Sequence, residues 1–83
     1  MPTNPQEQNS ATLRALSLLE MIVGSESPVS LAEAVSHTGL PKPTVHRVLV
    51  LLERAGMLLR EPNTKRYSPG RRLSSLALDT LLH

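Results

Sequence analysis

The spacing of hydrophobic residues along this chain changes at Gly56. Before Gly56, apolar residues recur with the three-to-four-residue period of a helix that buries one face. After Gly56, apolar and polar residues alternate over a few positions, as they do in a short strand. The pattern therefore predicts helices before Gly56 and a β-hairpin after it.

The first predicted helix begins near Asn9 or Ser10, either of which can cap it. We expect it to end at Gly24 in the left-handed conformation. Its predicted buried face consists of Ala15, Leu16, Leu19, Ile22 and Val23. Residues 1–10 are polar, include two prolines and show no apolar pattern, so they predict a disordered tail.

Two further helices are expected on either side of Gly39, after an extended segment at residues 28–30. Ser30 and Glu33 have the spacing of a capping box, so the second helix should start after Ser30. Prolines 41 and 43 fix the start of the third helix, because proline is tolerated only in the first turn. The predicted buried stripe of the third helix is Val45, Val48, Leu49 and Leu52. Because residues 48–52 are all apolar, we expect this half of the helix to be covered on most sides.

Residues 57–61 and 65–68 predict the two strands of a hairpin, with a turn at 62–64. Gly70 then opens a final helix over residues 71–83. The final helix lacks a capping residue at its end and has more leucine than a small core needs. This surplus predicts both a partner subunit and a longer parent protein.

The fold class predicted from these elements is mainly α with a small β-hairpin, a winged helix-turn-helix followed by a linker helix. The predicted domain covers residues 11–70, with the helix-turn-helix at about 31–55 and the wing at about 57–69. Two helices joined by a tight turn with glycine, the second carrying polar and basic groups, are typical of DNA-binding proteins.

The charges are unevenly distributed, although the net charge is only +2. Residues 42–72 contain eight Lys or Arg and two Glu, whereas residues 1–41 contain one Arg and four Glu. Such a basic half is typical of a surface that binds phosphate. From charge alone, a solvated face that keeps the protein soluble is an equally good interpretation.

Other classes of function lack their characteristic residues. The chain has no cysteine, which fits a reducing cytoplasm, and no apolar run of membrane-spanning length. The three histidines lack metal-ligand spacing, and there is no glycine-rich phosphate loop. Tyr67 is the only aromatic residue, so a stacking platform for single-stranded nucleic acid is not expected. We therefore expect neither catalysis nor a cofactor nor a bound metal.

Three blocks closely resemble the isocitrate-lyase-regulator (IclR) family of bacterial transcription regulators. They are RALSLLE at 14–20, GLPKPTVHR at 39–47 and RYSPGRRL at 66–73. The resemblance runs from about residue 11 to residue 76. It implies a dimeric domain that binds an operator in double-stranded DNA. It also implies a linker helix and a larger domain, absent from this chain, through which a small-molecule effector would act.

The resemblance and the motif together predict the residues that contact DNA. In the third helix these are Lys42, Pro43, Thr44, His46 and Arg47, and outside it they are Ser30, Lys65 and Arg66. Pro43 stands where the family commonly has serine, so a hydroxyl is missing there. For His46 a buried, hydrogen-bonded histidine is an equally good interpretation. Ser30 has capping as its other role, and for Lys65 and Arg66 solubility is equally possible.

The sequence therefore predicts sequence-specific binding of double-stranded DNA by a cytoplasmic, dimeric bacterial regulator, with the third helix in the major groove. The alternative is a winged-helix module that binds protein or serves only for dimerisation. An acidic or apolar recognition surface would favour that alternative, and the basic half of the chain argues against it.

Overall fold

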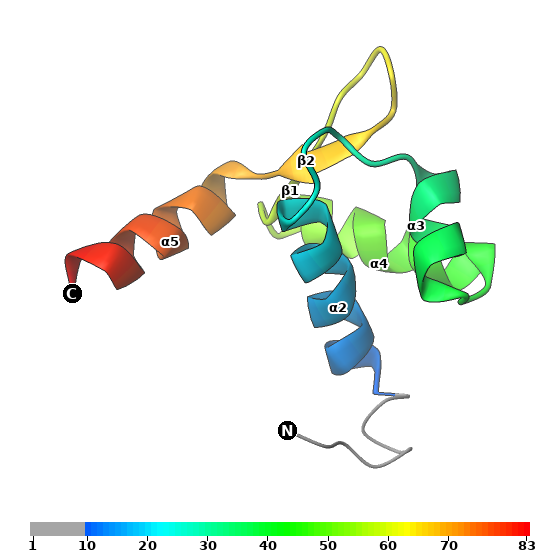
Figure 1. Ribbon diagram of the computed structural model, residues 1–83, viewed down its shortest axis with the longest axis horizontal. Helices are drawn as coiled ribbons and strands as arrows, with labels where there is room; N and C mark the ends of the chain where they lie inside the picture. Colours follow the sequence, from blue (N-terminus) through cyan, green and yellow to red (C-terminus); the bar gives the residue numbers. More distant parts are fainter. Residues whose placement is uncertain (1–9) are drawn as a thin grey trace.

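The computed structural model describes residues 10–83 of the chain (Figure 1). Along these residues the elements are α2 (Ala11–Val23), α3 (Leu31–Thr38), α4 (Lys42–Arg54), β1 (Leu58–Arg60), β2 (Tyr67–Pro69) and α5 (Arg71–Leu82). The predicted class, mainly α with one hairpin, is confirmed. The disordered tail predicted for residues 1–10 lies outside the described residues, apart from Ser10.

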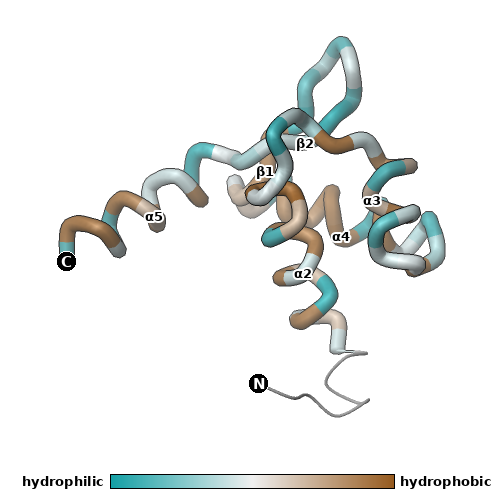
Figure 2. The backbone as a smooth tube through the Cα atoms, viewed as in Figure 1, coloured by the Kyte–Doolittle hydropathy of each residue, from teal (hydrophilic) through white to brown (hydrophobic). Residues whose placement is uncertain are grey.

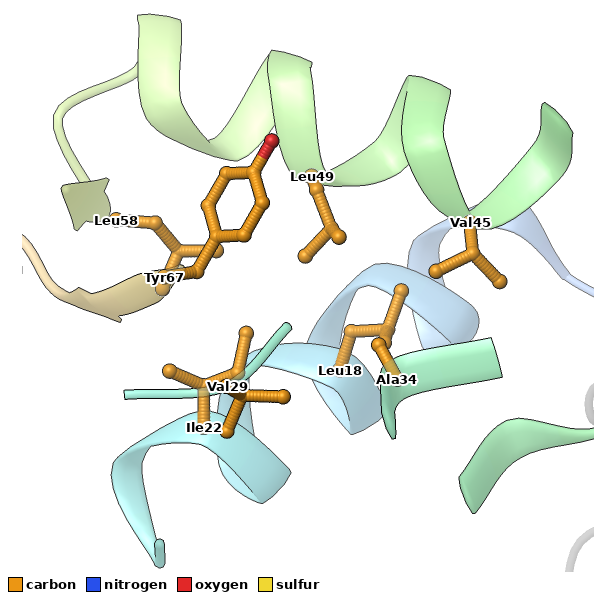
Figure 3. Packing of buried hydrophobic residues seen from close by; sticks show 8 residues of the cluster. All are labelled: Leu18, Ile22, Val29, Ala34, Val45, Leu49, Leu58 and Tyr67. Atoms are coloured by element: carbon orange, nitrogen blue, oxygen red, sulfur yellow. The ribbon is translucent and has the colours of Figure 1, made fainter. Parts of the chain in front are cut away.

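One hydrophobic core joins α2, α3, α4 and the hairpin (Figure 3). Its buried members are Leu18, Ile22, Val29, Ala34, Val45, Leu49, Leu58 and Tyr67. The predicted stripe of α4 is confirmed, because Val45 and Leu49 are buried while Val48 and Leu52 pack against the cluster. Tyr67 brings β2 into the core, and this contact anchors the hairpin to the helices.

The predicted buried face of α2 is partly wrong. Ile22 is buried as expected, but Leu16 and Val23 are 48% and 50% exposed. Leu18, which lies outside the predicted face, is fully buried. Leucine occurs at positions 13, 16, 18 and 19, so the helical period alone allows more than one face. Packing selects Leu18 together with Ile22, one turn later on the same side of α2.

The helix ends follow local chemistry with one exception. Ser10 and Ser30 cap α2 and α3 with their hydroxyl groups, and Pro41 precedes α4 as predicted. Gly39 ends α3 with φ +70°, a conformation that favours glycine. Gly24, by contrast, has φ −78°, so the left-handed conformation predicted there is wrong. The Gly24 N–H donates to the Glu20 carbonyl at 2.9 Å, and this bond closes the last turn of α2 without a left-handed residue.

The wing, residues 57–69, has shorter strands than the sequence predicts. β1 and β2 are antiparallel, with Leu59 opposite Ser68 at the centre. The loop that connects them runs from residue 61 to residue 66, so it is longer than the predicted turn at 62–64. The Glu61 N–H donates to the Arg66 carbonyl at 2.8 Å and closes this loop. Lys65 takes φ +60° within this loop. We call residues 61–66 the wing loop, and Figure 2 shows its tip in hydrophilic colours.

The segment before α3 pairs with the wing. Val29 and Tyr67 exchange two backbone hydrogen bonds, of 2.8 and 2.7 Å. The extended segment predicted at residues 28–30 is therefore present, as a single bridge. It connects the start of the helix-turn-helix directly to β2.

α5 extends from the body on the side away from α3 (Figure 1). It follows Gly70, where a Cβ atom would lie 2.4 Å from the Gly56 carbonyl oxygen, so only glycine fits. α5 contains no buried residue, and Leu81 and Leu82 are 81% and 79% exposed. No helix among residues 10–83 is long and apolar enough to cross a membrane.

Candidate nucleic-acid interface

The first half of α4 exposes a polar and basic surface. Lys42, Pro43, His46 and Arg47 are exposed, and we call these four residues the recognition face. Positions 43, 46 and 47 lie on one side of a helix by their spacing. The buried Val45 and Leu49 lie on the opposite side and hold α4 against the core. The packing of α4 therefore turns the recognition face outward.

His46 is exposed, so the alternative of a buried, hydrogen-bonded histidine is wrong. Thr44 is half-buried and borders the recognition face. The cover expected over residues 48–52 is also incomplete, because the Leu51 side chain is 54% exposed. A run of five apolar residues in a helix must place at least one away from a one-sided core, and here it is Leu51.

A cleft of about 290 Å³ joins the recognition face to the wing. Its lining includes three predicted contact residues, Ser30, His46 and Lys65, together with Arg60. The cleft therefore gathers groups from the start of α3, from α4 and from the wing. Thr44 and Arg47 lie on the other flank of α4, at a groove of about 340 Å³ beside α2.

Ser30 caps α3 as predicted. Its hydroxyl oxygen accepts from the Glu33 N–H at 3.1 Å, and the hydroxyl donates to the Glu33 carboxylate at 3.1 Å. The carboxylate also accepts from the Arg66 guanidinium. The Arg66 guanidinium, and after it the Ser30 hydroxyl, hold the pKa of the Glu33 carboxyl below its usual value.

Arg66 differs from the other predicted contact residues because its side chain already has partners in the protein. Its Nη1 atom donates to the Glu33 carboxylate and to the Pro28 carbonyl, the latter at 3.2 Å. Lys65, the next residue, is exposed at the wing loop. From the sequence, Glu33 was predicted only to cap α3, because its ion pair with Arg66 joins residues 33 positions apart and leaves no local signal.

Metal chemistry has no obvious site here: among residues 10–83 no group of three His, Asp or Glu side chains could hold an ion. The functional groups of this surface are cations, hydroxyls and one imidazole. Such groups hydrogen-bond to phosphate oxygens and to the edges of bases.

The model of the IclR helix-turn-helix domain matches residues 11–62. The chain is also similar to the probable transcriptional regulator SauR of Cupriavidus necator, with 36% identity over 74 residues. That alignment covers 89% of this chain and 29% of SauR, so the chain spans less than a third of this relative.

Solved structures show the same arrangement of elements. An IclR family transcriptional regulator from Brucella abortus matches with a TM-score of 0.80 and 27% identity, over 98% of this chain and 33% of that one. An IclR homologue from Microbacterium hydrocarbonoxydans, solved with 4-hydroxybenzoate, matches with a TM-score of 0.73 and 28% identity. The second match covers 83% of this chain and 28% of the homologue.

Proposed function

The chain belongs to the IclR helix-turn-helix family of transcription regulators, and we propose that it binds operator DNA with the recognition face in the major groove. The observation that carries the proposal is the outward orientation of positions 43, 46 and 47, opposite the buried Val45 and Leu49. In a helix-turn-helix, the exposed N-terminal part of the second helix, here α4, enters the major groove of DNA.

Each polar group near this face has a partner on DNA that suits its chemistry. Arg47 can donate two hydrogen bonds to guanine O6 and N7, which discriminates against other bases by roughly 1–3 kcal/mol. Lys42 suits phosphate or guanine. Thr44 offers its hydroxyl to phosphate and its methyl group to thymine. Pro43 supplies contact area but no hydrogen bond, and His46 can reach a base or a phosphate from the cleft.

The flanks of the face suit the DNA backbone. Lys65 and Arg60 bring positive charge to the cleft from the wing, and Ser30 brings a hydroxyl from the start of α3. Contacts of this kind fix the register of the protein on DNA without reading sequence. Arg66 was predicted to be among them, but its guanidinium already donates to the Glu33 carboxylate and the Pro28 carbonyl.

We expect the chain to act as a homodimer on a two-fold-related site. The exposed leucines of α5 support a partner subunit, because a soluble monomer gains nothing by exposing them. Two such domains would read half-sites about 10 bp apart, or a multiple of that. A small-molecule effector would act through a further domain outside this chain, in the bacterial cytoplasm. We expect no catalysis, cofactor or membrane association.

The test is titration of a duplex carrying the preferred sequence, beside a scrambled duplex, with Arg47→Ala and the native chain. Arg47→Ala should lose roughly 1–3 kcal/mol of affinity for the preferred duplex and little for the scrambled one. The matched control is Arg54→Ala, at the other end of α4, which should weaken both duplexes equally or not at all. Equal losses for Arg47→Ala on both duplexes would overturn its role in reading bases.

Salt dependence separates this function from a protein-binding module. Phosphate contacts make log affinity fall against log salt by about 0.9 per contact. A flat dependence, or no duplex bound from a random pool, would contradict DNA binding altogether.

A further inference from the structure

A set of hydrogen bonds connects the wing to the helix-turn-helix through the side chain of Arg66. Its Nη1 atom reaches the Glu33 carboxylate on α3 and the Pro28 carbonyl in the preceding segment. The two acceptors lie on either side of Ser30, the residue that caps α3. Arg66 therefore links the wing loop to the first turn of the helix-turn-helix.

Hydrogen bonds with Ser30 orient Glu33 independently of Arg66. Its carboxylate accepts from the Ser30 hydroxyl at 3.1 Å, and its N–H is fixed by the same hydroxyl oxygen. Pro28 is also fixed, because the neighbouring Val29 exchanges two backbone hydrogen bonds with Tyr67. Arg66 thus binds two acceptors whose positions the fold has already set.

The backbone of Arg66 holds the wing loop at the same time. Its carbonyl accepts from the Glu61 N–H at 2.8 Å, and its N–H donates to the Thr64 hydroxyl at 3.2 Å. Thr64 in turn donates to the Glu61 carboxylate at 2.8 Å. The side chain and the backbone of Arg66 thus connect the helix-turn-helix to the loop that carries Lys65.

We propose that Arg66 and Glu33 are a positioning pair that sets the wing loop relative to the recognition face. In this role Arg66 does not contact DNA. It holds Lys65 and Arg60 where they meet the DNA backbone while α4 lies in the groove. The inference rests on the proposed function for its effect on DNA, and on the contacts above for its geometry.

The pair contributes through geometry rather than through stability. The two side chains are 42% and 54% exposed, so solvent screens their attraction. Exposed ion pairs of this kind add little to the free energy of folding. Variants at these positions should therefore fold, and their effect on DNA binding can be measured.

The direction in which Glu33→Gln changes the affinity for DNA distinguishes a positioning role of the carboxylate from that of a negative charge near DNA. If Glu33 acted only as a negative charge near DNA, removing that charge would raise the affinity. A positioning role predicts the opposite, a loss of about two- to fivefold on the preferred duplex. The control is Glu26→Gln, which removes an exposed charge in the loop before α3 and should leave the affinity unchanged or slightly higher.

Arg66→Gln is compared with Lys65→Gln, because the two residues are adjacent cations in the wing loop. Lys65→Gln should make the salt slope less negative by about 0.9, since it removes a phosphate contact. Arg66→Gln should also lower the affinity, but its loss should be smaller in a Lys65→Gln background, because Arg66 acts partly through the contact that Lys65 makes. The double variant Glu33→Gln/Arg66→Gln should bind no more weakly than Arg66→Gln alone, because both changes break one interaction.

A measurement without DNA separates failure of this inference from failure of the proposed function. In the free protein, Arg66→Gln should lower the NMR order parameters of the backbone amides of residues 61 and 63–66 and leave those of α4 unchanged. Unchanged order in the wing loop would overturn the inference, whether or not any duplex binds. Equal losses for Arg66→Gln with Lys65 present and with Lys65 replaced by Gln would also overturn it, as would raised affinity for Glu33→Gln.

Discussion

α4 and α5 are similar in length but differ in burial, because only α4 packs residues into the core. α4 buries Val45 and Leu49 and exposes cations, so its own chain determines which side faces outward. α5 has no fully buried residue and exposes leucines at positions 76, 78, 81 and 82. Figure 2 shows hydrophobic positions along α5 although it extends away from the body. The difference teaches that the core alone orients the recognition helix, whereas nothing within residues 10–83 covers the leucines of α5.

The largest expected effect contrasts one leucine from each helix. Leu49→Ala should lower the free energy of unfolding by about 2–5 kcal/mol, because it leaves a cavity in the core. Leu82→Ala should change it by less than about 0.5 kcal/mol, since the side chain is exposed. Urea denaturation at concentrations where the chain is monomeric measures both. Similar losses for the two variants would remove the distinction between the helices.

The next effect concerns self-association through α5. Replacing both Leu78 and Leu82 with serine should weaken a dimer at least tenfold, because burying one leucine contributes about 1.5–3 kcal/mol. Analytical ultracentrifugation over a concentration series measures the change, with Leu51→Ser on α4 as the control. If both variants dimerise like the native chain, the exposed face of α5 is not the partner surface.

A smaller effect is expected at the turn that sets α4 against α3. Gly39→Ala forces a Cβ atom into φ +70°, which should cost about 1 kcal/mol of stability although nothing lies within 4 Å of the added atom. Thermal unfolding measures this cost. Gly24→Ala has no such conformation to strain, and a loss as large as that of Gly39→Ala would contradict the explanation.

The smallest effect is a dependence of stability on pH near α3. The folded pKa of Glu33 is lowered, first by Arg66 and then by Ser30, from its ordinary value of 4.5. A lowered pKa contributes stability above the unfolded pKa, and this contribution is lost as the pH falls through the folded pKa. Stability measured from pH 6 downward should therefore fall less steeply in Glu33→Gln than in the native chain. Identical profiles would contradict the lowered pKa of Glu33.

Elements specified by neighbouring residues could be predicted from the sequence. The Ser30 cap, the turn at Gly39 and the start of α4 after Pro41 each depend on local chemistry, and the structure has all three. The buried stripe of α4 also follows from the sequence, but the exposure of His46 on the opposite side was left open there. Where several orientations were compatible, as with the leucines of α2, only packing could choose.

Features that depend on distant residues could not be predicted. The partners of Arg66 are 33 and 38 positions away in the sequence, so the prediction as a DNA contact considered only its charge. Lys65 takes the left-handed conformation of the wing loop although lysine is not a usual residue for it. The hydrogen bonds of the loop impose this conformation, and no local pattern in residues 61–66 indicates it.

Selection of duplexes from a random pool, repeated with Arg47→Ala, tests the central claim most directly. The native chain should enrich two related half-sites about 10 bp apart, or a multiple of that. Arg47→Ala should retain this spacing but lose preference at one base in each half-site. If both proteins enrich the same bases with equal strength, the recognition face of α4 does not read DNA.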